Sequence, residues 1–418
     1  MDPNPEAESR VSSNEESDSA VGADPAGFIR RLPTQVLRSA AVIAATMIGC
    51  QALAASSTSP SAVVGLLPDG LSGAKASFLS GFQLGQEEAR DCGVDPVAVD
   101  WQTFKSDQGV PLSTGPETAL LVAPFAADLR GFSSLAQDQK LGVVLPYQRG
   151  ESLASLVELD PEGRLHPVLS PLQDDLEQLA SDALAQGWKR VMVVADPSDR
   201  SADQAEDFVE MYQRLGGRVE SFEDPLVQTV DPENPVALER LFQDLTWKGP
   251  DALVLATSPE SPLALQLADA QAKGALGVTP TARAWVWMLP SHRVQDLPMR
   301  SWKQLVLEQP AHGPAWSGFQ ERFLAERGQT PDLLAASGYD TARMLTLASL
   351  APSPVSVEGT RHPLAWLDPD QEPASLCDAV AARLSGDSVR LMGAASDLSQ
   401  RPGQAPSGEA STRLMSGR

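Results

Sequence analysis

A set of polar and aromatic side chains follows directly after short apolar runs of the sequence. They are Asp69, Ser72, Phe125, Tyr147 and Gln148 in the first half of the chain, and Asp196, Ser198, Asp199, Thr257, Ser258 and Ser291 in the second. Hydroxyl groups and the free N–H groups of helix starts bind an anionic group. Asp196 or Asp199 would bind an ammonium group, and Tyr147 offers a ring for stacking. A simpler interpretation is that Asp196, Ser198 and Asp199 cap the next helix.

Signatures of catalysis are absent from the sequence. It has no G-x-S-x-G, P-loop or G-x-G-x-x-G segment and no CxxC pair. The four histidines, which the pattern places in loops beside proline or turn residues, are His166, His292, His312 and His362. The acid pairs Asp174-Asp175 and Glu87-Glu88 fall on expected helices and are predicted to face solvent. We therefore expect no enzymatic activity, no cofactor and no metal.

Alternating strand and helix patterns must position these residues. The runs Val191–Ala195 and Asp251–Ala256 are short, unbroken and apolar, which is typical of strands buried on both faces of a parallel sheet. Helical spacing precedes the first run at 174–184 and separates the two at 205–215 and 236–245. This alternation predicts right-handed βαβ units in a doubly wound sheet, whose ligands bind beyond the carboxyl ends of the strands.

The same alternation predicts a complete α/β lobe in the first half of the chain. Strands are expected at 62–67, 97–101, 118–123 and 141–145, and helices at 74–90 and 129–137. A crossover at 165–171 leads to the second lobe, which adds a strand at 284–289. Its Trp285 and Trp287 are predicted to pack in the core. Helices at 316–327 and 331–350 are expected to return to the first lobe, and a further helix is expected at 374–384.

The amino-terminal residues predict export. Residues 1–28 are an acidic segment without apolar periodicity, which indicates disorder. Residues 29–55 carry arginines, a short apolar run and small residues, as in a secretory signal. Cleavage after Ala52-Leu53-Ala54 would leave a soluble chain, whereas Met47-Ile-Gly-Cys50 resembles a lipobox that would leave Cys50 acylated. A single-pass anchor is the third alternative, although the run is short for a bilayer.

The amino-acid composition limits the classes of molecule that the chain is expected to bind. The chain has 418 residues, 42% of them hydrophobic, and a formal charge of −23. This charge argues against nucleic acid and anionic lipid, which need a surplus of lysine and arginine. Besides Cys50, the cysteines are Cys92 and Cys377. An oxidising compartment would allow them to form a bridge, but two buried thiols are the favoured interpretation.

The order of several segments resembles the type I periplasmic binding proteins, especially the branched-chain amino acid receptors of ABC transporters. The opening strand is Val63–Pro68, the first helix contains Gly81–Ala89, and later units are Gly187–Asp196, Trp247–Ala256 and Gly338–Ala342. The resemblance covers about residues 61–400. It implies two Rossmann-like α/β lobes joined by a hinge: 61–165 plus 291–350, and 166–290 plus 351–398. A disordered tail would follow at 399–418.

The resemblance implies a monomeric, periplasmic protein that holds a small amino acid or amide-like ligand between its lobes and delivers it to an ABC permease. The strand ends Pro124-Phe-Ala-Ala127 and Pro146-Tyr-Gln-Arg149 lack the paired hydroxyls that this family uses for an amino acid carboxylate. A second fold-sharing family activates cell-wall synthesis through protein contacts. A regulatory, non-transport function is therefore the alternative.

Overall fold

The computed structural model describes residues 62–105, 118–125, 127–150, 153–197, 199–221, 225–257, 260–276, 284–288, 302–350, 362–398 and 404–416. The expected export signal with Cys50, and also Ser198, Ser258, Ser291 and His292, lie outside these residues. Within the described part of the chain, no helix has the length and apolar character needed to cross a membrane.

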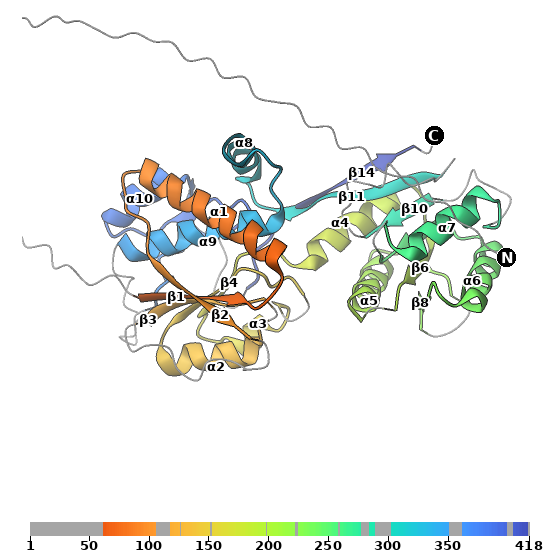
Figure 1. The fold of residues 1–418 in the computed structure, drawn as a ribbon, viewed down its shortest axis with the longest axis horizontal. Coiled ribbons are helices and arrows are strands. Elements are labelled where there is room, and N and C mark those ends of the chain that lie inside the picture. The colour runs from red at the N-terminus through yellow and green to blue at the C-terminus, as the bar shows by residue number, and fades with distance from the viewer. Residues whose placement is uncertain are drawn as a thin grey trace, which may run out of the picture. The chain divides into compact units, whose positions relative to one another are not determined.

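The first sheet is parallel, with strand order β2-β1-β3-β4-β5. Its strands are β1 (Ala62–Pro68), β2 (Val99–Phe104), β3 (Thr118–Val122), β4 (Gly142–Leu145) and β5 (Leu165–Pro167). Its helices are α1 (Ser72–Asp91), α2 (Leu129–Gln139), α3 (Leu156–Leu159), α8 (Trp316–Arg327) and α9 (Leu333–Leu350). Figure 1 shows strands β1 to β4 between α1 and α9 on one side and α2 on the other. The sequence predicted the main strands and helices to within a few residues.

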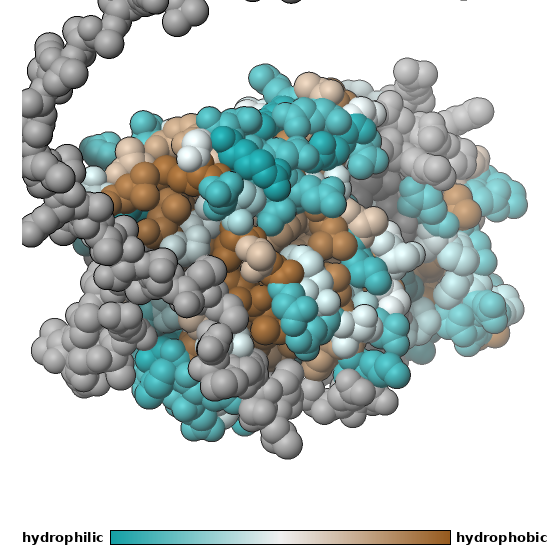
Figure 2. All heavy atoms as spheres, turned by 60° about the vertical axis from the view of Figure 1, so that its left-hand side comes forward, coloured by the Kyte–Doolittle hydropathy of each residue, from teal (hydrophilic) through white to brown (hydrophobic). Residues whose placement is uncertain are grey.

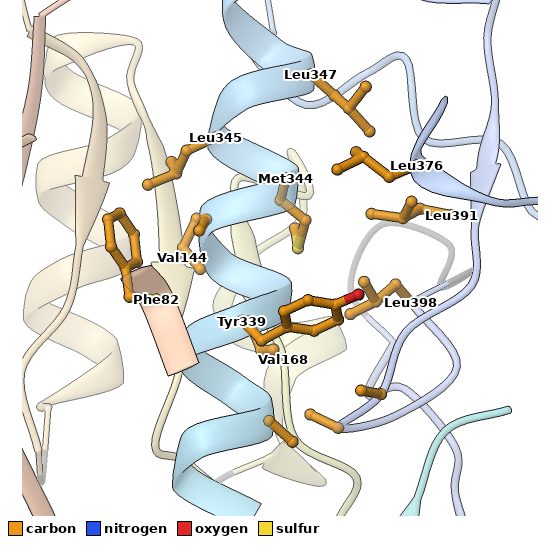
Figure 3. Packing of buried hydrophobic residues seen from close by; sticks show 14 of the residues in the cluster. Phe82, Val144, Val168, Tyr339, Met344, Leu345, Leu347, Leu376, Leu391 and Leu398 are labelled. Carbon is orange, nitrogen blue, oxygen red and sulfur yellow. The ribbon is translucent and has the colours of Figure 1, made fainter. Parts of the chain in front are cut away.

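Both faces of the first sheet are buried, which explains the unbroken apolar runs. Alternate residues of β4 belong to different cores: Val144 packs with α1 and α9, whereas Val143 and Leu145 pack with α2 and α3. Figure 3 shows α9 within the first of these cores. Phe82 and Val144 lie on one side of α9, and Leu376, Leu391 and Leu398 lie on the other. The late helix α9 therefore covers the first sheet, as predicted.

Glycines allow α1 and α9 to approach closely. A Cβ atom added at Gly81 of α1 would lie 1.7 Å from the carbonyl oxygen of Ala335 in α9. A Cβ atom at Gly338 of α9 would lie 2.0 Å from the carbonyl oxygen of Phe78. Any larger residue at either position would force the helices apart.

The second sheet has the order β14-β11-β10-β9-β6-β7, and β8 also pairs with β6. Its strands are β6 (Arg190–Ala195), β7 (Arg218–Val219), β8 (Val227–Thr229), β9 (Ala252–Leu255), β10 (Ala284–Trp287), β11 (Lys303–His312) and β14 (Glu409–Met415). The helices that alternate with them are α4 (Leu172–Ala185), α5 (Asp199–Arg214), α6 (Pro235–Lys248) and α7 (Pro262–Ala272). All its strand pairs are parallel except β11 with β14.

Local signals fix the helices of the second sheet. Asn234 accepts hydrogen bonds from two N–H groups of α6, whose first residue is Pro235, and Gly249 ends the helix with a φ of 52°. On the sheet, Trp285 and Trp287 are fully buried, which confirms their predicted place in the core. The doubly wound α/β class predicted from the sequence is therefore correct.

Three boundary predictions differ from the structure. Residues 303–312, which the sequence placed in the first lobe as part of 291–350, form β11 of the second sheet. Residues 409–415 form β14, an antiparallel strand on β11, so the expected disordered tail does not hold there. Residues 362–398 were assigned to the second lobe, yet Leu364, Trp366 and Leu376 share a core with α1 and α9. This segment also forms α10 (Leu376–Leu384) and the small parallel pair β12 (Pro373–Ala374) and β13 (Arg390–Leu391).

Cys92 and Cys377 form a disulfide, with their Cα atoms 5.0 Å apart. The favoured interpretation of two buried thiols is therefore wrong. Cys92 follows the last turn of α1, and Cys377 lies in the first turn of α10. The bridge joins residues that are 285 positions apart in the sequence, so it fastens the late segment to the first helix. No local pattern could reveal this pairing.

The face of the molecule drawn in Figure 2 is largely polar. Figure 2 shows mostly hydrophilic residues among the described parts of one face, interrupted by patches of hydrophobic residues. Among the described residues, the most exposed large apolar side chains are Trp247 and Val236 of α6, which are 82% and 73% exposed. Single exposed apolar residues are normal in soluble proteins and carry no functional conclusion.

Candidate functional site

Three strands of the first sheet end at residues predicted to contact a ligand. β1 leads to Asp69 and Ser72, β3 to Phe125, and β4 to Tyr147 and Gln148. Because β1, β3 and β4 are parallel neighbours, their carboxyl ends share one edge of the sheet. This is the edge at which ligands of open α/β sheets bind. The topology therefore gathers the predicted residues of the first lobe as expected.

The turn from β1 to α1 exposes polar groups. Gly70 and Leu71 both have positive φ, at 91° and 47°, and no side chain caps the amino terminus of α1. The Asp69 side chain is exposed, while its backbone N–H donates to the carbonyl oxygen of Phe104. Ser72 is the exposed first residue of the helix. This turn offers uncapped N–H groups, a hydroxyl and a carboxylate, but it holds no buried polar group.

An aromatic stack lies at the ends of β3 and β4. The rings of Phe125 and Tyr147 are 3.6 Å apart between centroids and nearly parallel, at 17°. The ring of Phe78 from α1 lies 5.0 Å from that of Tyr147. One face of Tyr147 is thus covered by Phe125 and is unavailable for the stacking on a ligand that the sequence suggested. The packing fixes where the Tyr147 hydroxyl group lies.

The Tyr147 hydroxyl is buried, and no hydrogen-bond partner lies among the residues that the structure describes. Burial raises the pKa of Tyr147 well above its ordinary value, so the hydroxyl stays protonated. A protonated hydroxyl can donate one hydrogen bond and accept others. Buried polar groups without a partner are rare in native proteins and call for an explanation.

Gln148 is the strongest such case at the strand ends. Gln148 is only 7% exposed. Neither its Oε1 nor its Nε2 atom has a hydrogen-bond partner in the described part of the chain. A carboxamide has two donors and an acceptor, and burying it unpaired costs free energy. Two residues earlier, the carbonyl oxygen of Pro146 accepts a hydrogen bond from the buried Ser337 of α9 at 2.6 Å, which ties the backbone of this turn to α9.

The predicted residues of the second sheet divide into two groups. At the ends of β6 and β9, the Thr257 hydroxyl donates to Asp196 Oδ2 at 2.7 Å, which joins these two neighbouring strands. Thr257 is buried and Asp196 is half-buried. Asp199 begins α5, at the place where the sequence suggested either a ligand contact or a cap. Ser198 and Ser258 lie outside the described residues.

The sequence missed a cluster of charges one residue beyond Gln148. Arg149 Nη1 lies 3.0 Å from Asp175 Oδ2, and Arg149 Nε donates to the carbonyl oxygen of Ser170 at 2.8 Å. Asp175 is only 2% exposed and also accepts from the backbone N–H of Ala311. The prediction that Asp174-Asp175 faces solvent is therefore wrong for Asp175. Its partner lies too far away in the sequence for helical spacing to reveal it.

This cluster ties together three segments that link the elements of the two sheets. The first runs from β5 to α4, the second is the end of β11, and the third is the described stretch 404–408 that leads into β14. Ser170 Oγ donates to the carbonyl oxygen of Ala311, and Asp174 Oδ2 accepts from the N–H of Gly408, both at 3.1 Å. Burial, followed by the charge of neighbouring Asp175, raises the pKa of Asp174, while the Gly408 bond opposes that shift.

Ion pairs of the other acid pair and the positions of two histidines also differ from the predictions. Glu87 forms an ion pair with Arg327 at 2.7 Å, and Glu88 with Arg343 at 3.3 Å. His166 lies in β5 rather than in a loop, and its ring packs edge-on to His362 with centroids 5.3 Å apart. His312 is the last residue of β11. These residues serve packing and pairing inside the protein.

The described residues contain no group of three or more histidine, cysteine, aspartate or glutamate side chains placed to hold a metal ion. A groove of about 460 Å³ runs along β8 and α6, lined by residues that include Thr229, Asn234 and Arg240. A second, of about 450 Å³, lies between α4 and β14. Neither groove is lined by a residue of the predicted site.

Comparison with known proteins places the fold. No protein-family model matches the chain, and no curated protein matches it in sequence. Solved structures do match. A Rhodospirillum rubrum protein described as a branched-chain amino acid ABC transporter has 17% identity and a TM-score of 0.58, over 84% of this chain and 96% of its own.

Two further structures come from Desulfitobacterium hafniense ABC transporter substrate-binding proteins. One has 16% identity and a TM-score of 0.54, over 85% of this chain and 98% of its own. The other, in complex with Leu, has 15% identity and a TM-score of 0.51, over 85% of this chain and 97% of its own. At these identities the likeness shows the fold alone, which is that of the type I periplasmic binding proteins.

Proposed function

We propose that this protein is an extracytoplasmic solute-binding protein that captures a small polar ligand and delivers it to an ABC transporter. The observation that carries this proposal is a pair of buried polar groups at the end of β4, in Tyr147 and Gln148, which have no hydrogen-bond partner among the described residues. They lie at the edge where this fold class binds ligands. A ligand that supplied their missing hydrogen bonds would gain free energy that the empty site lacks.

In this proposal the second sheet supplies the other half of the site through Asp196 and Thr257. A ligand that contacts the ends of both sheets favours a closed arrangement over an open one, because it interacts with both halves only when they are close. The three linking segments around Asp175 are the natural place for this hinge. The protein performs no chemistry on the ligand and needs no cofactor.

The cellular setting follows from the same proposal. The export signal predicted at 29–55 would place the protein in the periplasm, either as a soluble monomer or tethered through acylated Cys50. The Cys92–Cys377 disulfide supports an oxidising compartment. The partners are a small molecule and a permease, and the charge of −23 opposes binding to nucleic acid.

A calorimetric screen of the full chain against amino acids, amides and urea tests this function. We expect at least one class to bind with one site per chain. If no solute in the panel binds, the proposal is contradicted.

The second candidate is a protein that regulates cell-wall synthesis by protein contact. The Phe125–Tyr147 stack favours it, because aromatic rings occupy strand ends at which hydroxyls were expected. This candidate predicts a silent solute panel together with specific capture of a cell-envelope enzyme by the full chain. Solute binding that depends on residues of the strand ends would exclude it as the main function.

A further inference from the structure

We propose that the Tyr147–Gln148 turn after β4 is a subsite for an uncharged carboxamide group of the ligand. The inference rests on the proposed solute-binding function and specifies the chemistry of its ligand.

The side chain of Gln148 sets the complementarity. Its two polar atoms, Oε1 and Nε2, are both buried and lack partners among the described residues. A ligand carboxamide also has an acceptor and donors side by side, so it can form hydrogen bonds with both atoms of Gln148 at once. A carboxylate has acceptors only and would leave Gln148 Oε1 facing another acceptor. Gln148 therefore discriminates between two groups of nearly equal shape.

The Tyr147 hydroxyl adds a second neutral group. It is buried without a described partner, in the residue next to Gln148. Stacking on Phe125 and contact with Phe78 hold the ring in place, so little freedom is lost when the hydroxyl binds. The raised pKa of Tyr147 keeps its proton in place. The turn thus offers preorganised groups without charge.

Arg149, the positively charged residue next to Gln148 in the sequence, already has partners inside the protein. Arg149 reaches Asp175 at 3.0 Å and the carbonyl oxygen of Ser170 at 2.8 Å. Its charge is therefore neutralised inside the protein. A ligand carboxylate at this turn would be buried without the paired cation that a buried anion requires. Both the polar pattern and the charge balance favour an amide over an acid.

The test is isothermal titration calorimetry of the full chain with a matched pair of probes, isobutyramide and isobutyrate, and with L-leucine as a third solute. The variants are Gln148→Leu, which removes the amide, and Gln148→Glu, which keeps the shape and replaces donors with acceptors. Gln83→Leu is the matched control, because Gln83 is an exposed glutamine on α1. Thermal unfolding of each variant confirms that it folds.

We expect the wild type and Gln83→Leu to bind isobutyramide about tenfold or more tightly than isobutyrate. Both Gln148 variants should lose this preference. Equal binding of the two probes, tighter binding of the acid, or a preference that survives Gln148→Leu would overturn the subsite. A crystal structure grown with isobutyramide that shows only a water molecule beside Gln148 would also overturn the subsite. If L-leucine binds while the amide preference is absent, only this inference fails; if no solute binds, the proposed function fails as well.

Discussion

Gln148 and Arg149 are neighbours in the sequence, yet their surroundings differ. Arg149 satisfies its guanidinium group with the Asp175 carboxylate and a backbone carbonyl, and Asp175 in turn accepts a backbone N–H. Gln148 is buried more deeply than Arg149, but its amide has no partner in the described part of the chain. One residue therefore belongs to a closed network, and the next leaves its hydrogen-bonding capacity unused.

This difference separates two uses of a buried polar group. A fully paired network fixes the positions of the segments it joins, here the three links between the elements of the two sheets. An unpaired group contributes nothing to the empty fold and is retained only at a cost. We infer that the Arg149–Asp175 cluster is structural and that Tyr147–Gln148 is for binding. The following predictions test this division.

The largest effect is expected from Asp175→Ala. The substitution leaves Arg149 without its carboxylate and Ala311 N–H without its acceptor, and breaking a buried pair in this way costs about 3–5 kcal/mol. Urea unfolding of the full chain measures the loss. The control is Glu177→Ala, because Glu177 is exposed on the same helix. A loss for Asp175→Ala as small as that of the control would show that the cluster does not hold the fold together.

The disulfide is the covalent counterpart of this network. Replacing both Cys92 and Cys377 with serine should lower the free energy of unfolding by about 2–4 kcal/mol, since the unfolded chain loses a long-range constraint. Dithiothreitol should lower the unfolding midpoint of the wild type and leave that of the double variant unchanged. Equal sensitivity of the two proteins to the reductant would contradict a role for this bridge.

Like Gln148, His166 has a buried polar group without a described partner, its ring nitrogen Nε2, but we expect it to affect stability as the pH changes rather than ligand binding. Burial, then the charges of His362 and Arg164, lower the pKa of His166, and burial also lowers that of His362. The pKa of a histidine in the unfolded chain is about 6.5, so unfolding takes up protons below that pH. The contribution of these two histidines to stability should therefore be constant above that pH and should fall as the pH drops toward their folded pKa values. Asp340, whose pKa burial raises to about 6, contributes in the opposite sense in both proteins compared below.

The slope of each histidine's contribution is at most about 1.4 kcal/mol per pH unit. Urea unfolding at several pH values measures this slope for the wild type and for His166→Gln. The variant should show a shallower slope below pH of about 6.5, whatever its stability at neutral pH. An identical slope in both proteins would mean that His166 is not the group responsible.

The smallest effect on stability is expected from Gln148→Leu. Because the amide has no described partner, replacing it with an apolar group of similar size should leave the free energy of unfolding unchanged or raise it by up to about 1 kcal/mol. Urea unfolding of the ligand-free full chain measures the difference. A loss of about 2 kcal/mol or more would place Gln148 with the structural network and remove the contrast with Asp175.

The sequence predicted what depends on local patterns. The strands of the sheet interiors and helices such as α1 follow from unbroken apolar runs and helical spacing. β14 was missed because Glu409–Met415 is mostly polar and half-exposed, and it becomes a strand only by pairing with β11. Strand ends placed Tyr147 and Gln148 in the candidate site. The burial of Asp175 and the Cys92–Cys377 bridge depend on distant partners, for which a single sequence gives no signal.

The most direct test of the account is a crystal structure of the full chain with the tightest-binding solute from the calorimetric screen. We predict that the solute lies at the carboxyl ends of β3 and β4, with a polar atom within hydrogen-bonding distance of the Gln148 amide. A solute bound only in the groove along β8 and α6, with Gln148 still unpartnered, would contradict the account.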